Sequence, residues 1–567
     1  MKTTGVVGRK LEKLDALTSL RFFAAAMIVI GHGYAYFHLP LLPTQFPLNQ
    51  GVSFFFVLSG FVLAYAYPEL PTFKHTLRFL WARFARIWPA HITALLLVFC
   101  LLPSSLWYVS YHHPVAYSLA NVFMVHAWIP FRESYLGLNG VSWSISTEFF
   151  FYLCFPLLLY KWHRTWAIKM LLVSSVLIIN ITLANYLELP ASSSYQGIGS
   201  HALLYIHPLS RLFEFSLGIC ACSLFTILKP HANRLSFSGA SLLELSIVVL
   251  MVSVLWLITL LSQNAHLLQV VGDAGVVWLI SSGGSFLFFF LILIFSFQRG
   301  VLSLVLRWKW LVLLGEISFS LYLVHSIVLK YLANNDMIDL PWAYAVYWLL
   351  SLVLAYLIFR AIEMPMRSLL LSYARQNGLQ SLMNKKGELL SFALYKNKTV
   401  FLFLTFLILI ASLLSYHPST LSRLSTQEAS KLALSSENIL SVSADYSDGL
   451  RLVALKRTNS ATQIDLNAVW CAMGDVTLKQ HMAIHFLDAQ RNMIKQEDRL
   501  LDRGQARISK GVCFSVNTKL DQKTMKDTDT LAIALYVDVK ALNSIESAMT
   551  TDWNHRRLIV PLHKDLK

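Results

Sequence analysis

The chain has 567 residues, of which 56% are hydrophobic and only 14% are charged, and its mean hydropathy is +0.55. Soluble proteins carry roughly 25% charged residues, so this composition excludes an ordinary soluble globular protein. The formal net charge of +16 is not evidence for nucleic-acid binding, because the basic residues gather in connections between apolar segments. We therefore expect a polytopic helical protein whose partner is the lipid bilayer and not a nucleic acid.

Apolar runs of about 20 residues recur along the chain, and each can cross the roughly 30 Å of hydrocarbon in a bilayer. We expect the first run not to be a cleaved signal peptide, because it lacks a small-residue cleavage site and further spans follow at once. The predicted spans are 15–37, 52–67, 87–103, 142–160, 167–187, 206–228, 243–262, 275–297, 311–332, 341–362 and 399–415.

Lys and Arg are unevenly distributed between the two sets of connections. Every second connection is rich in Lys and Arg. The connections between these, up to residue 340, hold few of them apart from Arg132 and Arg211. This positive-inside pattern predicts a cytoplasmic amino terminus. The apolar segment 115–130 would reverse the pattern if it were a span, so we interpret it as interfacial or re-entrant. The basic connections are 2–13, 74–86, 161–169, 229–234, 299–309 and 367–398.

The first span, "LTSLRFFAAAMIVIGHGYAYF", contains two ionisable residues, Arg21 and His32. Such residues are costly in a bilayer and usually face a protein interior or a watery cavity. A spacing of eleven residues puts both on one helical face, roughly 16 Å apart along the axis. Arg21 alone could snorkel to the headgroups, and His32 alone could be a hydrogen-bonded core residue. Together they indicate a conduit along this face.

The next two motifs lie on the second span and before the third. "NQGVSFFFVLSGFVLAY" contains small residues, among them Ser59, that permit close helix packing or surround a narrow channel. "FLWARFARIWPAH" places Arg83 and Arg86 on one helical face. An arginine pair suits phosphate groups through charge-assisted hydrogen bonds. The alternative is that both arginines only anchor the cytoplasmic side.

The motif "NGVSWSISTEFFFYLCFPL" puts Glu148 inside the outer end of the fourth span, near Trp143. We place it at a depth similar to that of His32. A His–Glu couple is suited to general acid–base work, because the carboxylate fixes the tautomer of the imidazole. Two further pairs are expected to form ion pairs within single helices: Arg211 with Glu214, and Glu363 with Arg367. Tyr322 and His325 lie one turn apart inside the ninth span.

These motifs, in this order, resemble the acyltransferase-3 family of membrane acyltransferases. The matching elements are the Arg21-x10-His32 pair, "FFFVLSGF", the Arg-x-x-Arg loop before "IWP", "SWSISTEFFFY" and "GEISFSLYLVH". The resemblance covers residues 14–367. It implies a bacterial inner-membrane enzyme that transfers an acyl group, commonly acetyl, from cytoplasmic acyl-CoA to an extracytoplasmic hydroxyl. It further implies an envelope polysaccharide such as O-antigen, capsule or exopolysaccharide, or a lipid-linked glycan, as the acceptor.

The resemblance suggests a mechanism that needs no metal. We expect His32, oriented by Glu148, to deprotonate the acceptor hydroxyl, which then attacks the thioester. An acyl-enzyme intermediate on His32 is the alternative. The remaining site residues are Arg21, Arg83 and Arg86, which we expect to hold the phosphates of acetyl-CoA, and Ser59, Trp143, Tyr322 and His325, which we expect to support the site.

The chain past residue 415 changes composition. Short apolar runs such as "LRLVALKR", "MAIHFLDA", "TLAIALYVDV" and "RRLIVPL" predict a β-sandwich. The predicted fold is a ten-helix, all-α body with one extra transmembrane helix and a small extracytoplasmic mainly-β domain. The predicted segments are a cytoplasmic tail (1–14), the membrane acyltransferase domain (15–367), a basic linker (368–398), the extra span (399–415), a polar linker (416–439) and the β-rich domain (440–567).

Two cysteines, Cys471 and Cys513, fall in the β-rich domain, and a disulfide between them is plausible on the oxidising side of the membrane. Some acyltransferase-3 members carry a hydrolase-like domain of the SGNH type here. In "CAMGDVTL" Val476 stands where that domain has its serine nucleophile. We therefore expect the domain to bind or position a partner and not to carry out chemistry.

Three other functions fit parts of the sequence. A transporter or flippase for envelope glycan intermediates would also need intramembrane ionisable residues, but it predicts substrate movement without use of acyl-CoA, and internal repeats, which we do not find. A glycan polymerase would have no use for the cytoplasmic arginine pair. A membrane-anchored sensor would leave His32 and Glu148 unexplained.

Overall fold

The computed structural model describes residues 12–372, apart from short gaps at 38–45, 104–105, 108–112, 192–197, 263–264, 336 and 339. Beyond residue 421 it describes the strands and some of their connections. The predicted extra span at 399–415 lies wholly outside the described residues, and the predicted linkers at 368–398 and 416–439 lie mostly outside them. The chain divides into two compact units, Met1–Leu413 and Leu414–Lys567.

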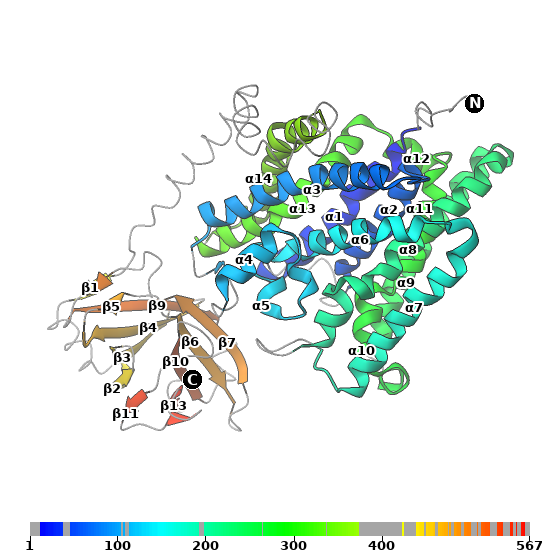
Figure 1. Cartoon of the computed structure of the whole chain (residues 1–567). Coiled ribbons are helices and arrows are strands. Elements are labelled where there is room, and N and C mark those ends of the chain that lie inside the picture. Colours follow the sequence, from blue (N-terminus) through cyan, green and yellow to red (C-terminus); the bar gives the residue numbers. More distant parts are fainter. Residues whose placement is uncertain are drawn as a thin grey trace. The chain divides into compact units, whose positions relative to one another are not determined.

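In the described part of the first unit, ten helices are long and apolar enough to cross a membrane, as the sequence predicts (Figure 1). A helix satisfies all its backbone hydrogen bonds internally, which a span in lipid requires. The spanning helices are α1 (Asp15–Phe37), α2 (Gly51–Ala66), α3 (Phe73–Leu101), α6 (Trp143–Leu159), α7 (Trp162–Tyr186), α8 (Pro208–Leu228), α9 (Phe237–Leu261), α10 (Ala265–Ser282) with α11 (Ser285–Ser296), α13 (Lys309–Asn334) and α14 (Ala343–Ile358).

The predicted third span, 87–103, is too short. Helix α3 begins at Phe73, where the side chain of Thr72 accepts a hydrogen bond from the backbone N–H of His75. The segment with Arg83 and Arg86 is therefore helical and part of the span, not a loop. Charged residues in a sequence usually mark a connection outside the membrane, but Arg83 and Arg86 line a cavity inside the helical unit.

The predicted span 275–297 is broken into α10 and α11. Gln50 compensates for the break, because its side-chain amide donates to the carbonyls of Leu279 and Ile280 and accepts from the N–H of Gly284 at 2.7 Å. Irregular backbone at membrane depth is tolerated only where such partners exist.

Glycines set the distances between the central helices. A Cβ on Gly315 of α13 would lie 1.9 Å from the carbonyl oxygen of Thr18 on α1, so only glycine lets these helices meet there. Gly60 of α2 and Gly218 of α8 do the same for their two helices, because a Cβ on either would lie 1.9 Å from a backbone oxygen of the other helix. Close contact through small residues is the usual means of packing helices in lipid. It brings α13 against α1 and α8 against α2.

The apolar segment 115–130 does not form a span. It contains the short helix α4 (Pro114–Val122) and the 3-10 turn η3 (His126–Trp128). Other short helices of this unit are α5 (Arg132–Tyr135), α12 (Val301–Leu306), the 3-10 turns η1 (Leu48–Gln50), η4 (Gly140–Ser142) and η6 (Lys229–Arg234), and the π-helical turns η5 (Ala202–Ile206) and η7 (Phe359–Glu363).

The second unit consists of antiparallel strands in its described residues, as predicted. A six-stranded sheet has the order β1-β9-β4-β3-β2-β11, and a five-stranded sheet has the order β12-β13-β10-β6-β7. The Tyr446 hydroxyl donates to the Ile533 carbonyl at 3.2 Å and links the two sheets, and Trp470 is fully buried. The strands are β1 (Ser422–Leu424), β2 (Asn438–Tyr446), β3 (Leu450–Asn459), β4 (Gln463–Ala472), β5 (Val476–Thr477), β6 (His481–Leu487), β7 (Met493–Leu500), β8 (Arg507–Ile508), β9 (Cys513–Asp521), β10 (Thr530–Tyr536), β11 (Ile545–Ser547), β12 (Thr551–Asp552) and β13 (Arg557–Pro561).

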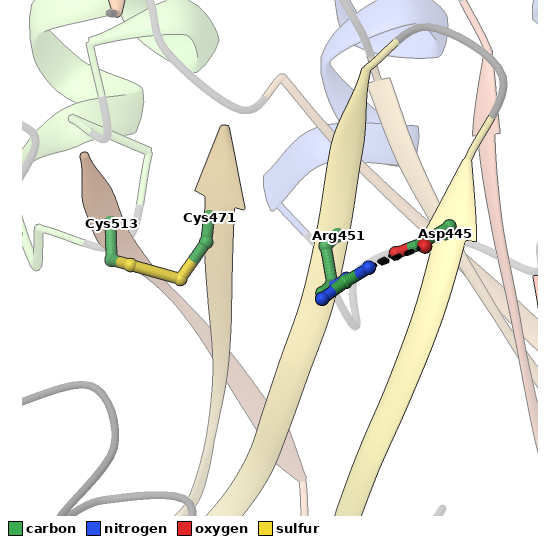
Figure 2. Close-up of a disulfide and its surroundings, with 4 residues drawn as sticks. All are labelled: Asp445, Arg451, Cys471 and Cys513. Atoms are coloured by element: carbon green, nitrogen blue, oxygen red, sulfur yellow. Dashed lines mark hydrogen bonds and ion pairs between the residues drawn. A yellow bond between two sulfur atoms is a disulfide. The ribbon is translucent and has the colours of Figure 1, made fainter. Parts of the chain in front are cut away.

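The disulfide between Cys471 and Cys513, which the sequence left undecided, is present and joins directly opposed residues of β4 and β9 (Figure 2). Across β3 and β2, Arg451 forms an ion pair with Asp445, with one Nη atom 2.6 Å from the carboxylate. In the strand register, Arg451 lies opposite both Asp445 and Cys471. One row across four strands is thus held by a covalent bond and an ion pair.

Candidate active site

A cavity of about 150 Å³ lies among α1, α2, α3, α6 and α13. Its volume suits a group of about the size of benzene. Six of the nine predicted site residues line it, and the other three, His32, His325 and Trp143, do not. The polar and charged residues of its wall are Arg21, Ser59, Arg83, Arg86, Ser144, Glu148, Tyr152 and Tyr322.

The three arginines of the wall differ in their partners. Among the described residues, Arg21 has no hydrogen-bond or ion-pair partner, although it faces the cavity. Arg83 has one long hydrogen bond, in which an Nη atom donates to the Tyr67 hydroxyl at 3.4 Å. Its guanidinium also lies 5.4 Å from the centre of the Tyr67 ring. Arg86 forms an ion pair with Glu363. Arg21 and Arg83 are therefore the arginines best placed to receive an anionic ligand.

Glu363 was expected to pair with Arg367, four residues on, and that prediction is wrong. Its carboxylate is fully buried, contacts Arg86 across the helices and accepts a hydrogen bond from the Ser320 hydroxyl at 3.0 Å. It belongs to η7, which is a π-helical turn, and such turns are frequent at functional sites. Because the sequence pattern considers only neighbours on one helix, it missed this long-range partner.

Replacing Glu363 with alanine is expected to lower the free energy of unfolding by about 3–5 kcal/mol, because Arg86 would keep its largely buried charge without a partner. Thermal unfolding of the detergent-solubilised protein measures this loss. Glu69, which is exposed, supplies the control, since its alanine variant should unfold like the wild type. Equal midpoints for the two variants would show that the Arg86–Glu363 pair does not stabilise the fold.

Glu148 also lines the cavity. One carboxylate oxygen accepts hydrogen bonds from the Ser59 hydroxyl at 3.0 Å and from the Tyr152 hydroxyl at 2.7 Å. Ser59 therefore contributes a donor and not only a small side chain. Tyr152 was not predicted as a site residue, although its position four residues after Glu148 on a helix was a usable signal.

Tyr322 and Ser144 also line the cavity. The Ser144 hydroxyl donates to the Tyr322 hydroxyl at 2.8 Å, and that hydroxyl donates to the carbonyl of Val141 at 2.8 Å. The Tyr322 ring also lies 5.8 Å from the ring of His325. Tyr322 therefore separates the cavity from the histidine. This cavity therefore does not extend along α1 from Arg21 to His32.

The predicted contact between His32 and Glu148 is wrong. Nδ1 of His32 lies 2.9 Å from Nε2 of His325, whereas Glu148 binds Ser59 and Tyr152. Glu148 lines the cavity together with Arg21, whereas His32 does not line it. Counting residues from predicted helix ends had placed the two groups at one depth.

Trp143 lies outside the cavity wall, against the rings of Phe56 and Tyr205 at 6.2 and 4.7 Å. The predicted ion pair of Arg211 with Glu214 is confirmed, with Nε and a carboxylate oxygen 3.0 Å apart. The Arg211 guanidinium also lies 5.0 Å from the ring centres of both Phe56 and Tyr205. These residues form a buried packing core beside the cavity.

Comparisons with known proteins agree with the family features of the helical unit. Residues 14–360 match the acyltransferase domain family, acyltransferase-3. Acyltransferase MdmB of Streptomyces mycarofaciens is 28% identical over 353 residues, which are 57% of this chain and 80% of that protein. Nodulation protein 10 of Rhizobium leguminosarum bv. viciae is 28% identical over 226 residues, 35% of this chain and 62% of that protein. O-acetyltransferase OatA of Staphylococcus aureus is 26% identical over 387 residues, 63% of this chain and 59% of that protein. No solved structure matches the chain significantly.

Proposed function

The chain belongs to the acyltransferase-3 family of membrane acyltransferases, and we propose that it transfers an acetyl group from acetyl-CoA to a hydroxyl of an envelope glycan. O-antigen, capsule, exopolysaccharide and lipid-linked glycans are the acceptor classes. The name of the relative OatA, an O-acetyltransferase, supports acetyl as the acyl group and oxygen as the acceptor atom.

The observation that carries the proposal is the guanidinium of Arg21, which lines the same cavity as Arg83 and has no hydrogen-bond or ion-pair partner among the described residues. Guanidinium groups bind phosphates by paired, charge-assisted hydrogen bonds. Arg21 and Arg83 therefore bind the CoA phosphates in our proposal, and Arg86, already paired with Glu363, adds positive charge. A pantetheine arm is larger than the cavity, so binding must widen it past Tyr322 toward His32.

At the thioester end of the pantetheine arm, His32 acts as the general base in this proposal. The proton of the acceptor hydroxyl passes to the imidazole, the oxygen attacks the thioester carbonyl, and the carbon–sulfur bond breaks. The imidazolium then returns the proton to the departing CoA thiolate, so the reaction needs no other reactant. Glu148 holds the hydroxyls of Ser59 and Tyr152 along the wall that the pantetheine arm would follow.

The sidedness of the reaction follows from the charge pattern. The basic connections mark the cytoplasmic side, and Arg21 lies near the amino-terminal end of α1. Acyl-CoA therefore enters from the cytoplasm of a bacterial cell, and the acceptor lies outside the inner membrane. The sequence predicts a further span at 399–415, which would put the β-rich unit on the acceptor side, and we propose that this unit positions the glycan there.

Labelled acetyl-CoA tests this function. Inside-out membrane vesicles that contain the protein should transfer the label to envelope glycan, and vesicles without it should not. Mass spectrometry of the labelled fraction then identifies the acceptor. If acetyl-CoA and longer or dicarboxylic acyl-CoAs all leave the glycan unlabelled, the proposal is wrong, and transport of a glycan intermediate becomes the next hypothesis to test.

A further inference from the structure

Two histidines from helices far apart in sequence meet beside the cavity. His32 lies on α1 and His325 on α13, and their nearest ring nitrogens are 2.9 Å apart. The ring centres are 5.1 Å apart and the planes differ by 17°. Because the centres are much farther apart than the nitrogens, the rings meet edge to edge. This is the geometry of an N–H···N hydrogen bond and not of a face-to-face stack.

The position of each proton follows from the second nitrogen of His325. Its Nδ1 lies 3.3 Å from the carbonyl oxygen of Leu321, and a carbonyl can only accept. Nδ1 of His325 therefore carries the hydrogen, and in a neutral imidazole the other nitrogen, Nε2, must accept. The hydrogen between the rings then belongs to Nδ1 of His32. Nε2 of His32 is left with a free lone pair.

Both rings are neutral in this arrangement. His325 is fully buried, and an unpaired charge there would be costly. No carboxylate contacts either histidine among the residues that the structure describes, and the charged group that acts on His32 is the cation of Lys330. The chain of hydrogen bonds from His32 through His325 therefore ends on the backbone carbonyl of Leu321 and not on an acidic side chain. His32 itself is exposed, so its free lone pair can reach a substrate.

We propose, on the basis of the proposed function, that His325 is the positioning residue of the reaction and fixes His32 in the tautomer with Nε2 unprotonated. Nε2 of His32 takes the proton of the acceptor hydroxyl while Nδ1 keeps its hydrogen and its bond to His325. The oxygen attacks the thioester, the carbon–sulfur bond breaks, and the same proton moves from Nε2 to the thiolate. His325 remains neutral throughout.

The rest of the fold supports this pair. Gly315 lets α13 contact α1 at Thr18, about three turns before the histidine on α13 and about four turns before that on α1. The Tyr347 hydroxyl donates to the carbonyl of Val29 at 3.1 Å and so ties α14 to α1 close to His32. No carboxylate among the described residues contacts the pair, so the imidazolium of His32 is not held in the charged state and gives up its proton readily to the thiolate.

Two substitutions of His325 test the proposal in native membranes with labelled acetyl-CoA. His325→Leu removes the acceptor for Nδ1 of His32 and should lower the rate at saturating acetyl-CoA by about 10²-fold, within the range of general-base effects, with an unchanged KM for acetyl-CoA. His325→Gln offers an amide oxygen near the position of Nε2 and should retain roughly a tenth or more of the wild-type rate. Equal, large losses in both variants would overturn the proposal, and so would a wild-type rate in His325→Leu.

A double variant separates this role from a purely structural one. If His325 acts only through His32, adding His325→Leu to His32→Ala should cause no further loss of rate, because residues that act as a unit are not additive. A further loss of 10-fold or more would overturn the proposal. An inactive wild type would overturn the proposed function and this inference together, whereas an active, His32-dependent wild type that tolerates His325→Leu would overturn this inference alone.

Discussion

Replacing His32 with alanine is expected to lower the rate of acyl transfer by about 10²- to 10⁴-fold, the factor that a positioned general base supplies. A sugar hydroxyl is a weak nucleophile until its proton is removed, and His32 provides a neutral imidazole nitrogen for that step. The KM for acetyl-CoA should stay unchanged, because His32 does not line the cavity that holds the arginines. Initial rates of label transfer at several acetyl-CoA concentrations measure both quantities.

The matched control is His163→Ala. His163 is exposed near the start of α7, outside the site, and its variant should keep the wild-type rate. Thermal unfolding should show that the His32→Ala variant still folds, with a loss of about 1–3 kcal/mol because the buried Nε2 of His325 loses its hydrogen-bond partner. Near-normal transfer by His32→Ala would refute the assignment of His32 as the base.

Replacing Arg21 with alanine is expected to raise the KM for acetyl-CoA by about 10- to 150-fold, since a hydrogen bond to a charged group contributes about 1.5–3 kcal/mol. The effect should fall mainly on KM, because the phosphates lie far from the reacting thioester and contribute equally to substrate and transition-state binding. The measurement is the dependence of the transfer rate on acetyl-CoA concentration.

A truncated donor provides the sharper test of this assignment. Acetyl-pantetheine lacks the phosphates of CoA, so the wild type and Arg21→Ala should use it equally well. Arg78→Ala is the matched control, because Arg78 lies on α3 like Arg83 but is exposed and does not line the cavity. If Arg21→Ala were equally impaired with both donors, Arg21 would not be a phosphate ligand.

Features that depend on neighbours in sequence could be predicted. The spans follow from the thickness of the hydrocarbon core, which each apolar run must cross. The Arg211–Glu214 pair is correct because both residues lie on one helical turn. The sequence limited a disulfide after residue 415 to one pairing, because Cys471 and Cys513 are the two cysteines there, but only the structure showed that this bond forms.

Features that depend on how deep distant helices lie and how they cross could not be predicted from the sequence. Glu363 was assigned to its helical neighbour and in fact pairs with Arg86, far away in sequence. Glu148 was assigned to His32 from estimated depth and in fact binds Ser59 and Tyr152. A shift of two turns along a helix, roughly 11 Å, is enough to exchange one partner for another, and no periodicity in a single sequence records it.

The amino-acid sequence by itself determined that this is a membrane protein with a helical body, a β-rich unit and a set of ionisable residues in its spans. It could do so because the bilayer penalises every buried charge and every unpaired backbone group, so both stand out locally. Only the tertiary structure decided which charges meet. Helix contacts such as that of Gly315 with Thr18 set His32 against His325 and leave Arg21 facing the cavity, and such contacts arise from packing between segments hundreds of residues apart.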